Sequence, residues 1–317
     1  MSKDLILPDH TEALGHGIYA IDTGFQRPRF DAAYLMVEAG RAAFIDSGTN
    51  HSVPRLLEAL DALGLARAAV DFVIPTHVHL DHAGGVGLLM RELPAATLIC
   101  HPRGLRHMVD PTQLWASATA VYGPEEMARS YGELVPVPAE RARPSSDELV
   151  LELAGRPLRF IDTPGHAKHH HCIWDARSRG WFTGDTFGLS YREFDEGGRP
   201  WALPTSTPVQ FEPEAMKASI ARMLAADPDC LYLTHYGRVR EVTRLAALLN
   251  GLIDGMTAVA RQAQAERHER IKQGLLALYA DSLRAHGHEM GTAEIEQLLA
   301  TDLELNAQGL EVWLGKA

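Results

Sequence analysis

Residues 76–82 decide how this chain is interpreted, and they read Thr76-His77-Val78-His79-Leu80-Asp81-His82. This stretch places three imidazoles and one carboxylate within six residues. Three more side chains of the same kinds follow along the chain, namely His166, Asp185 and His235. Five His and two Asp side chains can hold two metal ions, and a two-metal centre can generate hydroxide near neutral pH and polarise an ester-like bond. The sequence therefore predicts a metal-dependent hydrolase.

The first metal ion is expected to be bound by His77, His79 and His166. In an extended stretch the side chains at positions i and i+2 point the same way, so His77 and His79 can bind one ion together. His166 follows Pro164-Gly165, where a glycine permits the tight turn that brings a ligand to the end of a strand.

The second metal ion is expected to be bound by Asp81, His82 and His235. Asp81 and His82 stand at the predicted start of a helix, where the chain turns and can direct them at another ion. Asp185 has two carboxylate oxygens, so it can bridge both ions. Asp46 ends a predicted strand and is placed to hold the second ring nitrogen of a ligand histidine.

The composition indicates a globular protein and argues against several kinds of binding partner. The chain has 317 residues, 46% apolar and 22% charged, which is ordinary for a globular protein with a sizeable core. A formal charge of −11 argues against binding nucleic acid or an anionic membrane surface. The three cysteines lack CxxC spacing, and residues 1–8 show no secretory signal. With no apolar run long enough to cross a bilayer, we expect a cytoplasmic protein that has no membrane partner.

Hydrophobic patterning predicts an α/β chain that becomes helical after about residue 239. Residues 103–145 differ from their surroundings and are interpreted as an insertion over the core. The predicted domains are a hydrolase domain, 1–240, and a helical C-terminal extension, 241–317. The predicted strands are 17–21, 33–37, 42–45, 70–75, 96–100, 148–153, 157–161, 171–174, 180–183 and 230–234, and the predicted helices before residue 239 are 53–63, 84–92 and 211–226.

These motifs resemble the metallo-β-lactamase superfamily over residues from about 17 to 240. The resemblance rests on His77-x-His79-x-Asp81-His82, on Pro164-Gly165-His166, on Gly184-Asp185-Thr186 and on the late His235. It implies a four-layer αββα sandwich with the metal ions at one edge, and it identifies Asp46 as the aspartate of the first motif. It favours the branch of the family that contains glyoxalase II and quorum-signal lactonases.

The resemblance implies a hydrolase of a small ester, lactone or thioester that uses a hydroxide held by two divalent ions. Zinc is the expected metal, with iron or manganese as alternatives because His and Asp sites accept several metals. Asp81 and Asp185 are the expected catalytic residues. Lactonases carry a tyrosine three residues after the bridging aspartate, where this chain has Gly188, so Tyr191 is the nearest catalytic candidate.

Three other functions remain open at this point. One is an oxidoreductase with a single Fe(II), like the persulfide dioxygenases of the same fold. Another is a phosphodiesterase or nuclease, which the acidic charge disfavours. The third is a non-catalytic scaffold, which the intact ligand set disfavours. The expected partner is a small-molecule substrate, and the helical extension could support a homodimer.

Overall fold

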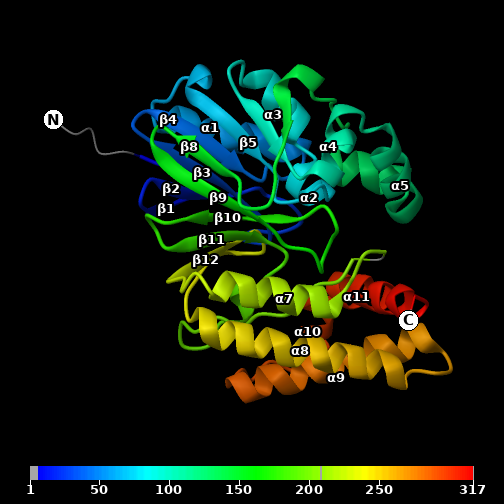
Figure 1. Cartoon of the computed structure of the whole chain (residues 1–317). Coiled ribbons are helices and arrows are strands. Elements are labelled where there is room, and N and C mark those ends of the chain that lie inside the picture. The colour runs from blue at the N-terminus through cyan, green and yellow to red at the C-terminus, as the bar shows by residue number, and fades with distance from the viewer. Residues whose placement is uncertain (1–5, 208, 317) are drawn as a thin grey trace.

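The computed structural model describes residues 6–207 and 209–316 and arranges their strands in two sheets, which lie between two helical layers (Figure 1). The first sheet has the order β1-β2-β3-β4-β5-β6-β7 and the second has the order β13-β12-β11-β10-β9-β8. The strands of the first sheet are β1 (Thr11–Gly15), β2 (Ile18–Asp22), β3 (Ala32–Glu38), β4 (Arg41–Ile45), β5 (Val70–Ile74), β6 (Thr97–Cys100) and β7 (Ala142–Pro144). The strands of the second sheet are β8 (Val150–Leu153), β9 (Arg156–Asp162), β10 (His171–Asp175), β11 (Gly180–Gly184), β12 (Cys230–Leu233) and β13 (Gly237–Val239).

Helices from the two halves of the chain cover opposite faces of this pair of sheets. On the first sheet lie α1 (Val53–Ala62), α2 (Leu80–Ala83), α3 (Val86–Glu92), α4 (Pro102–Val109), α5 (Thr112–Tyr122) and α6 (Pro124–Glu126). On the side of the second sheet lie α7 (Pro213–Leu224), α8 (Val242–Gln262), α9 (Arg267–His286), α10 (Thr292–Leu298) and α11 (Ala300–Leu314), and α9 packs against α8 and α11 rather than on the sheet itself. The predicted four-layer αββα sandwich with a helical C-terminal region is therefore present.

Each pair of neighbouring layers encloses its own apolar cluster. Tyr34, Phe160 and Phe182 belong to the cluster between the sheets. Phe44 belongs to the cluster under the first helices, and a third cluster joins the second sheet to all the C-terminal helices. Burial of this apolar surface is the main force holding the layers together. Because the third cluster crosses residue 240, the helical extension shares its core with the sandwich; the domain division itself stays a prediction.

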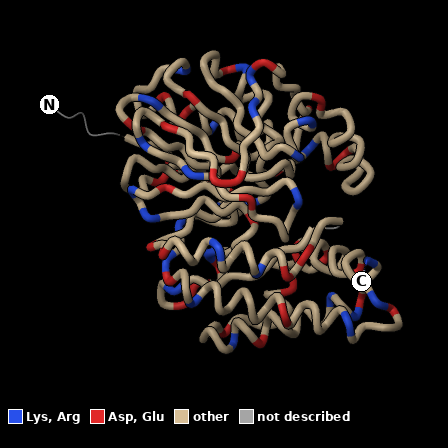
Figure 2. Tube along the Cα trace, in the orientation of Figure 1, with Lys and Arg blue, Asp and Glu red and all other residues tan. Residues whose placement is uncertain are grey.

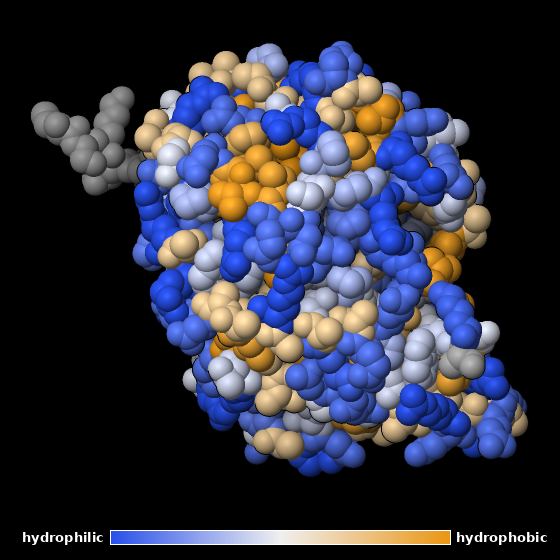
Figure 3. Space-filling view, viewed as in Figure 1, coloured by the Kyte–Doolittle hydropathy of each residue, from blue (hydrophilic) through white to orange (hydrophobic). Residues whose placement is uncertain are grey.

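The long helix α8 has the length and the apolar composition that could cross a membrane. Its buried residues Leu245, Leu249, Ile253 and Met256 recur at helical spacing and face the cluster shared with the second sheet. Hydrophilic residues cover much of the lower helical layer in the face that Figure 3 shows. Packing inside a helical layer thus accounts for the apolar character of α8.

Several expectations about the course of the chain need correction. Strands β1 and β13 were not predicted from the sequence. The segment 103–145 is not wholly an insertion, because β7 pairs in parallel with β6 and so belongs to the first sheet. The sequence of β7, Ala-Arg-Pro, lacks the apolar alternation by which a strand is recognised. The N-terminal stretch without a secretory signal includes residues 1–5, which lie outside the described residues.

A buried ion pair fixes β9 to the end of β10, far along the strands from the metal-ligand loops. The Arg156 guanidinium donates to both Asp175 oxygens at 2.9 and 2.6 Å, and both side chains are almost fully buried. Burial opposes ionisation of Asp175, but the hydrogen bonds from Arg156 outweigh it and lower the pKa of Asp175.

We expect Arg156→Met to lower the free energy of unfolding by about 3–5 kcal/mol near neutral pH, because it leaves the Asp175 charge buried and unpaired. The lowered pKa of Asp175 means that the stabilisation by the pair is present above the ordinary pKa of aspartate, roughly 4, and is lost as the pH falls below it. The difference between wild type and variant should therefore shrink in acid. Urea denaturation of wild type and variant, near neutral pH and again in acid, measures this difference in the free energy of unfolding. A difference that stays the same in acid would contradict the stabilising role given to the Arg156–Asp175 pair.

Candidate metal centre

The seven predicted ligands meet at one edge of the sandwich because each follows the end of a strand or begins the short helix α2. His77 and His79 lie in the loop after β5, and His79 is the residue that caps α2. Asp81 and His82 lie within α2 itself. The remaining three ligands follow β9, β11 and β12, and they are His166, Asp185 and His235.

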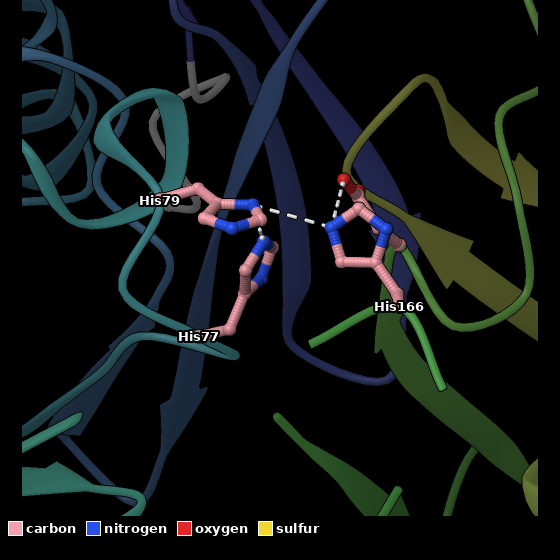
Figure 4. Close-up of side chains that lie close together, drawn as sticks. His77, His79 and His166 are labelled. Carbon is pink, nitrogen blue, oxygen red and sulfur yellow. Dashed lines mark hydrogen bonds and ion pairs between the residues drawn. The ribbon is translucent and has the colours of Figure 1, made fainter. Parts of the chain in front are cut away.

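Three imidazoles and one carboxylate form the first group. His77 Nε2 lies 2.7 Å from His79 Nδ1, which lies 3.2 Å from His166 Nε2. His166 Nε2 is also 3.3 Å from Asp185 Oδ2. Figure 4 shows the rings of His77, His79 and His166 turned toward a common point. One potential ligand atom from each of the four residues lies within 4.8 Å of all the others.

Asp81, His82 and His235 form the second group. His235 Nε2 lies 3.3 Å from Asp81 Oδ2, and His82 Nε2 lies 3.7 Å from the same oxygen. Asp185 Oδ1 faces this group, at 3.4 Å from His82 Nε2 and 3.8 Å from His235 Nε2. The two oxygens of Asp185 therefore face different groups, as a bridging carboxylate requires.

The outer ring nitrogens show which nitrogen is free to bind an ion. His166 Nδ1 and His235 Nδ1 lie 3.1 and 2.8 Å from the carbonyl oxygens of Thr205 and Phe30. A carbonyl can only accept, so each Nδ1 carries a proton, and Nε2 is the ring nitrogen that faces the ligand group and would bind an ion in its deprotonated form. Such outer partners raise the basicity of ligand imidazoles and fix their orientation.

Asp46 lies behind the second group and forms hydrogen bonds with His82 and with neighbouring residues. Its Oδ2 lies 2.9 Å from His82 Nδ1 and accepts from the Thr234 hydroxyl at 2.8 Å. The other oxygen, Oδ1, accepts from the Thr76 backbone N–H at 2.6 Å, and the Thr76 hydroxyl donates to Oδ2 at 3.1 Å. Asp46 is 1% exposed and has a positive φ of 56°, so these bonds hold a backbone conformation that aspartate seldom adopts. Asp46 occupies the place expected of it behind a ligand histidine.

His170 also supports the centre, although its role could not be assigned from the sequence. Its Nε2 accepts the Asp185 backbone N–H at 3.2 Å, and its ring stacks on His77 with centroids 4.8 Å apart. Gly184 makes this approach feasible, because a Cβ there would lie 2.6 Å from both His170 Nε2 and the Thr76 hydroxyl. A histidine between two ligand motifs was the only sequence signal for this role.

Burial and charge shift the pKa values of the histidines in the two groups in opposite directions. Burial lowers the pKa of His77 and His79 well below the usual range and also lowers the pKa of His166. These three imidazoles are therefore neutral and offer lone pairs. In the second group burial opposes protonation, but Asp185 and Asp81 outweigh it and raise the pKa of His235 to about 9. The same two carboxylates, with Asp46, raise the pKa of His82 well above its ordinary value.

The donor set fits divalent metal ions. Among residues 6–207 and 209–316, His82 Nε2 and Asp185 Oδ1 are buried and lie 3.4 Å apart, and neither atom makes a hydrogen bond of good geometry. Buried polar atoms without partners are rare and costly in folded proteins. Converging lone pairs of neutral imidazoles are likewise unfavourable unless a cation lies between them. Imidazole nitrogens with carboxylate oxygens are ligands that zinc, iron and manganese accept.

Tyr191 is placed differently from the other catalytic candidates. Its ring packs against Phe30 and turns an edge toward His235, with centroids 5.2 and 6.5 Å apart. Its hydroxyl donates to Asp302 of α11 at 3.2 Å and is fully buried. The structure thus directs the Tyr191 hydroxyl at the helical extension, and burial raises the pKa of Tyr191 well above the ordinary value. A proton-transfer role for this hydroxyl gains no support from this placement.

Aromatic rings connect the segment 103–145 to the second group. Tyr131 of this segment packs on Phe25 with centroids 5.4 Å apart, and Phe25 packs on Phe30 at 5.9 Å. Phe30 then contacts the His235 ring at 5.2 Å. The segment therefore reaches the metal centre through side chains that come from the loop between β2 and β3.

A comparison with protein families tests the family resemblance that the sequence motifs suggested. A family profile described as the metallo-beta-lactamase superfamily matches residues 27–235. The chain belongs to this superfamily. The matched region contains all seven grouped side chains and Asp46.

Individual relatives share the fold at low identity. The metallo-beta-lactamase fold-containing protein ST1585 of Sulfurisphaera tokodaii is 24% identical over 70% of this chain and 79% of its own. Its crystal structure has a TM-score of 0.65, at 21% identity, covering 94% of this chain and 99% of that one. The family protein TTHA1429 of Thermus thermophilus has a TM-score of 0.68, at 19% identity, covering 96% and 95%. A hydroxyacylglutathione hydrolase of Acidiphilium cryptum is 27% identical over 74% of this chain and 75% of its own.

Proposed function

We propose that this protein is a metal-dependent hydrolase of a small ester, lactone or thioester. The observation that carries the proposal is the pair of ligand groups that share Asp185, with one carboxylate oxygen facing each group. The relative from Acidiphilium cryptum is named for hydrolysis of a hydroxyacylglutathione. That name supports an acyl-transfer reaction to water as the class of chemistry.

Each residue of the metal centre has a proposed role in the reaction. Divalent ions held by the two groups would lower the pKa of a water molecule and polarise the substrate carbonyl. Asp185 would hold the spacing of the two groups, and the carbonyls of Thr205 and Phe30 would keep His166 and His235 in the tautomer that binds metal. Asp81 is 25% exposed, the most exposed carboxylate of the set, so it is the residue proposed to pass a proton to solvent.

A small substrate is favoured over nucleic acid. Acidic and basic residues are interspersed along the trace in Figure 2, and the formal charge is −11. Binding a polyanion would require a concentration of positive charge along one face. The cytoplasmic location and the homodimer stay predictions.

Metal removal and substrate screening test the proposal together. We expect zinc-loaded protein to hydrolyse at least one member of a panel of lactones, acyl thioesters and simple esters, and we expect a chelator to abolish that activity until zinc is returned. A phosphodiester substrate in the same assay separates the phosphodiesterase alternative. Activity that survives complete metal removal would contradict the proposal, and oxygen uptake by the iron-loaded protein with a persulfide would favour the oxidoreductase.

A further inference from the structure

The loop of residues 204–207 holds His166 from two sides. The Thr205 carbonyl accepts the proton of His166 Nδ1 at 3.1 Å, as described above. The Thr207 hydroxyl donates to the backbone carbonyl of His166 at 3.1 Å. The direction of His166 Nε2 therefore depends on where this loop lies. Because the loop has no helix or strand of its own at these positions, something else must fix it.

Asn306 of α11 is the residue that fixes the loop. Its Oδ1 accepts the backbone N–H of Ser206 at 2.7 Å, and its Nδ2 donates to the Pro204 carbonyl at 3.3 Å and to the Tyr279 hydroxyl at 3.0 Å. The side chain is fully buried. One amide thus brackets Thr205 by binding the residue before it and the residue after it. An amide is suited to this task because it offers an acceptor and a donor on one rigid plane.

Gly309 provides separate evidence that α11 is seated closely on the same loop. A Cβ at Gly309 would lie 2.2 Å from the Ser206 hydroxyl oxygen and 2.5 Å from the Thr207 carbonyl oxygen. Gly309 stands three residues after Asn306, so both lie on one face of the helix. The backbone of α11 therefore contacts the loop where only a residue without a side chain fits.

We propose that Asn306 is a positioning residue of the metal centre, acting through the Thr205 carbonyl on His166. The C-terminal helical layer would then help to orient a ligand of the first group, although Asn306 lies far along the chain from His166. This inference rests on the metal binding of the proposed function, but not on any particular substrate.

Loss of the hydrogen bonds from Asn306 to the loop is expected to lower the affinity for metal. Partners that orient ligand residues contribute about 10- to 100-fold in metal affinity. Asn306 acts through one intervening carbonyl, so we expect Asn306→Ala to weaken zinc binding at the first group by about 10-fold, the lower end of that range. The second group has no contact with this loop among the interactions described above, so its affinity should change little.

A double-mutant cycle on metal affinity tests the inference. Metal-stripped wild type, Asn306→Ala, His166→Ala and the double variant are titrated with zinc ions alone, and thermal unfolding of each metal-free protein is recorded. If Asn306 acts through His166, the loss caused by Asn306→Ala should vanish in the His166→Ala background. An equal loss in both backgrounds, or no loss in either, would overturn the inference.

Tyr279→Phe is the matched control. It removes one hydrogen bond of Asn306 that does not involve the loop, so zinc affinity should stay close to that of wild type even if stability falls. If Asn306→Ala does not fold, Asn306→Asp replaces it, since it keeps an acceptor for Ser206 and loses the donor for Pro204. That substitution should still weaken zinc binding, and unchanged affinity would count against the inference.

The outcomes separate this inference from the proposed function. Wild type that binds two zinc ions but hydrolyses nothing in the panel would contradict the hydrolase alone. Wild type that binds zinc and hydrolyses a substrate, with no coupling between Asn306 and His166, would contradict the positioning role alone. A wild type that takes up no zinc would contradict both.

Discussion

Replacing Asp185 by alanine is expected to abolish hydrolysis and to release the metal pair. Both carboxylate oxygens are used, Oδ2 toward His166 and Oδ1 toward His82. Alanine removes the ligand that the two groups share, so each group keeps only three of its donors. Loss of several kcal/mol of transition-state stabilisation corresponds to a rate reduction on the order of 10³-fold or more. Steady-state rates and metal content of the purified variant measure the two effects.

Asp162→Asn provides the control for this experiment. Asp162 is also an aspartate near the edge of the second sheet, but it pairs with His101 and is not in either ligand group. This variant should keep its metal content and its rate close to those of wild type. An Asp185→Ala protein that retained two ions and normal turnover would show that the bridging assignment is wrong.

Replacing Asp46 by asparagine is expected to weaken the second group without removing any of its ligands. The carboxylate accepts from His82 Nδ1, two hydroxyls and one backbone N–H, and all of these partners are buried. The asparagine side chain would direct an N–H group at some of these donors. If His82 then turns its Nδ1 lone pair toward the newly introduced amide, its Nε2 becomes protonated and can no longer bind an ion.

We expect Asp46→Asn to lower zinc affinity at the second group by about 10- to 100-fold. Stability should also fall by about 1–3 kcal/mol for each buried donor left without a partner. Asp175→Asn separates the two effects, because Asp175 is an equally buried carboxylate that binds Arg156 rather than a ligand histidine. It should lower stability and leave zinc affinity unchanged. Equal zinc affinity in wild type and Asp46→Asn would contradict the role given to Asp46.

The ligand set could be predicted from the sequence because each ligand lies in a short motif of polar residues at the end of an apolar strand. His77 to His82 are recognisable by their density, and Asp46 by its place after the predicted strand 42–45. The structure brings all seven predicted ligands together, and their binding of metal is what the experiments above test. Strands with clear apolar patterns, such as β5 and β12, fall where the pattern placed them.

The groups that orient the ligands could not be predicted from the sequence, and the physical reason differs from one group to the next. The partners of His166 and His235 are backbone carbonyls, and every residue has one, so no residue type marks Thr205 or Phe30. Asn306 reaches the site only through the packing of α11, and a single buried asparagine has no local pattern. The strand β7 was missed because its pairing with β6 is set by tertiary context rather than by its own sequence.

The family resemblance suggests Tyr191 as a catalytic residue, and the structure directs its hydroxyl at the helical extension. Its sequence position lies near that of the lactonase tyrosine, but its hydroxyl binds Asp302. The C-terminal helix thus supplies the partner that determines the direction of this side chain. The same helix carries Asn306, so α11 uses buried polar residues to bind both Tyr191, which packs beside His235, and the loop that contacts His166.

Anomalous diffraction from a crystal of the zinc-loaded protein would show whether the two ligand groups bind metal ions. We expect two zinc peaks, one among His77, His79 and His166 and one among Asp81, His82 and His235, with Asp185 contacting both. No zinc peak at this edge of the sandwich, or zinc bound elsewhere while these side chains point apart, would contradict this expectation.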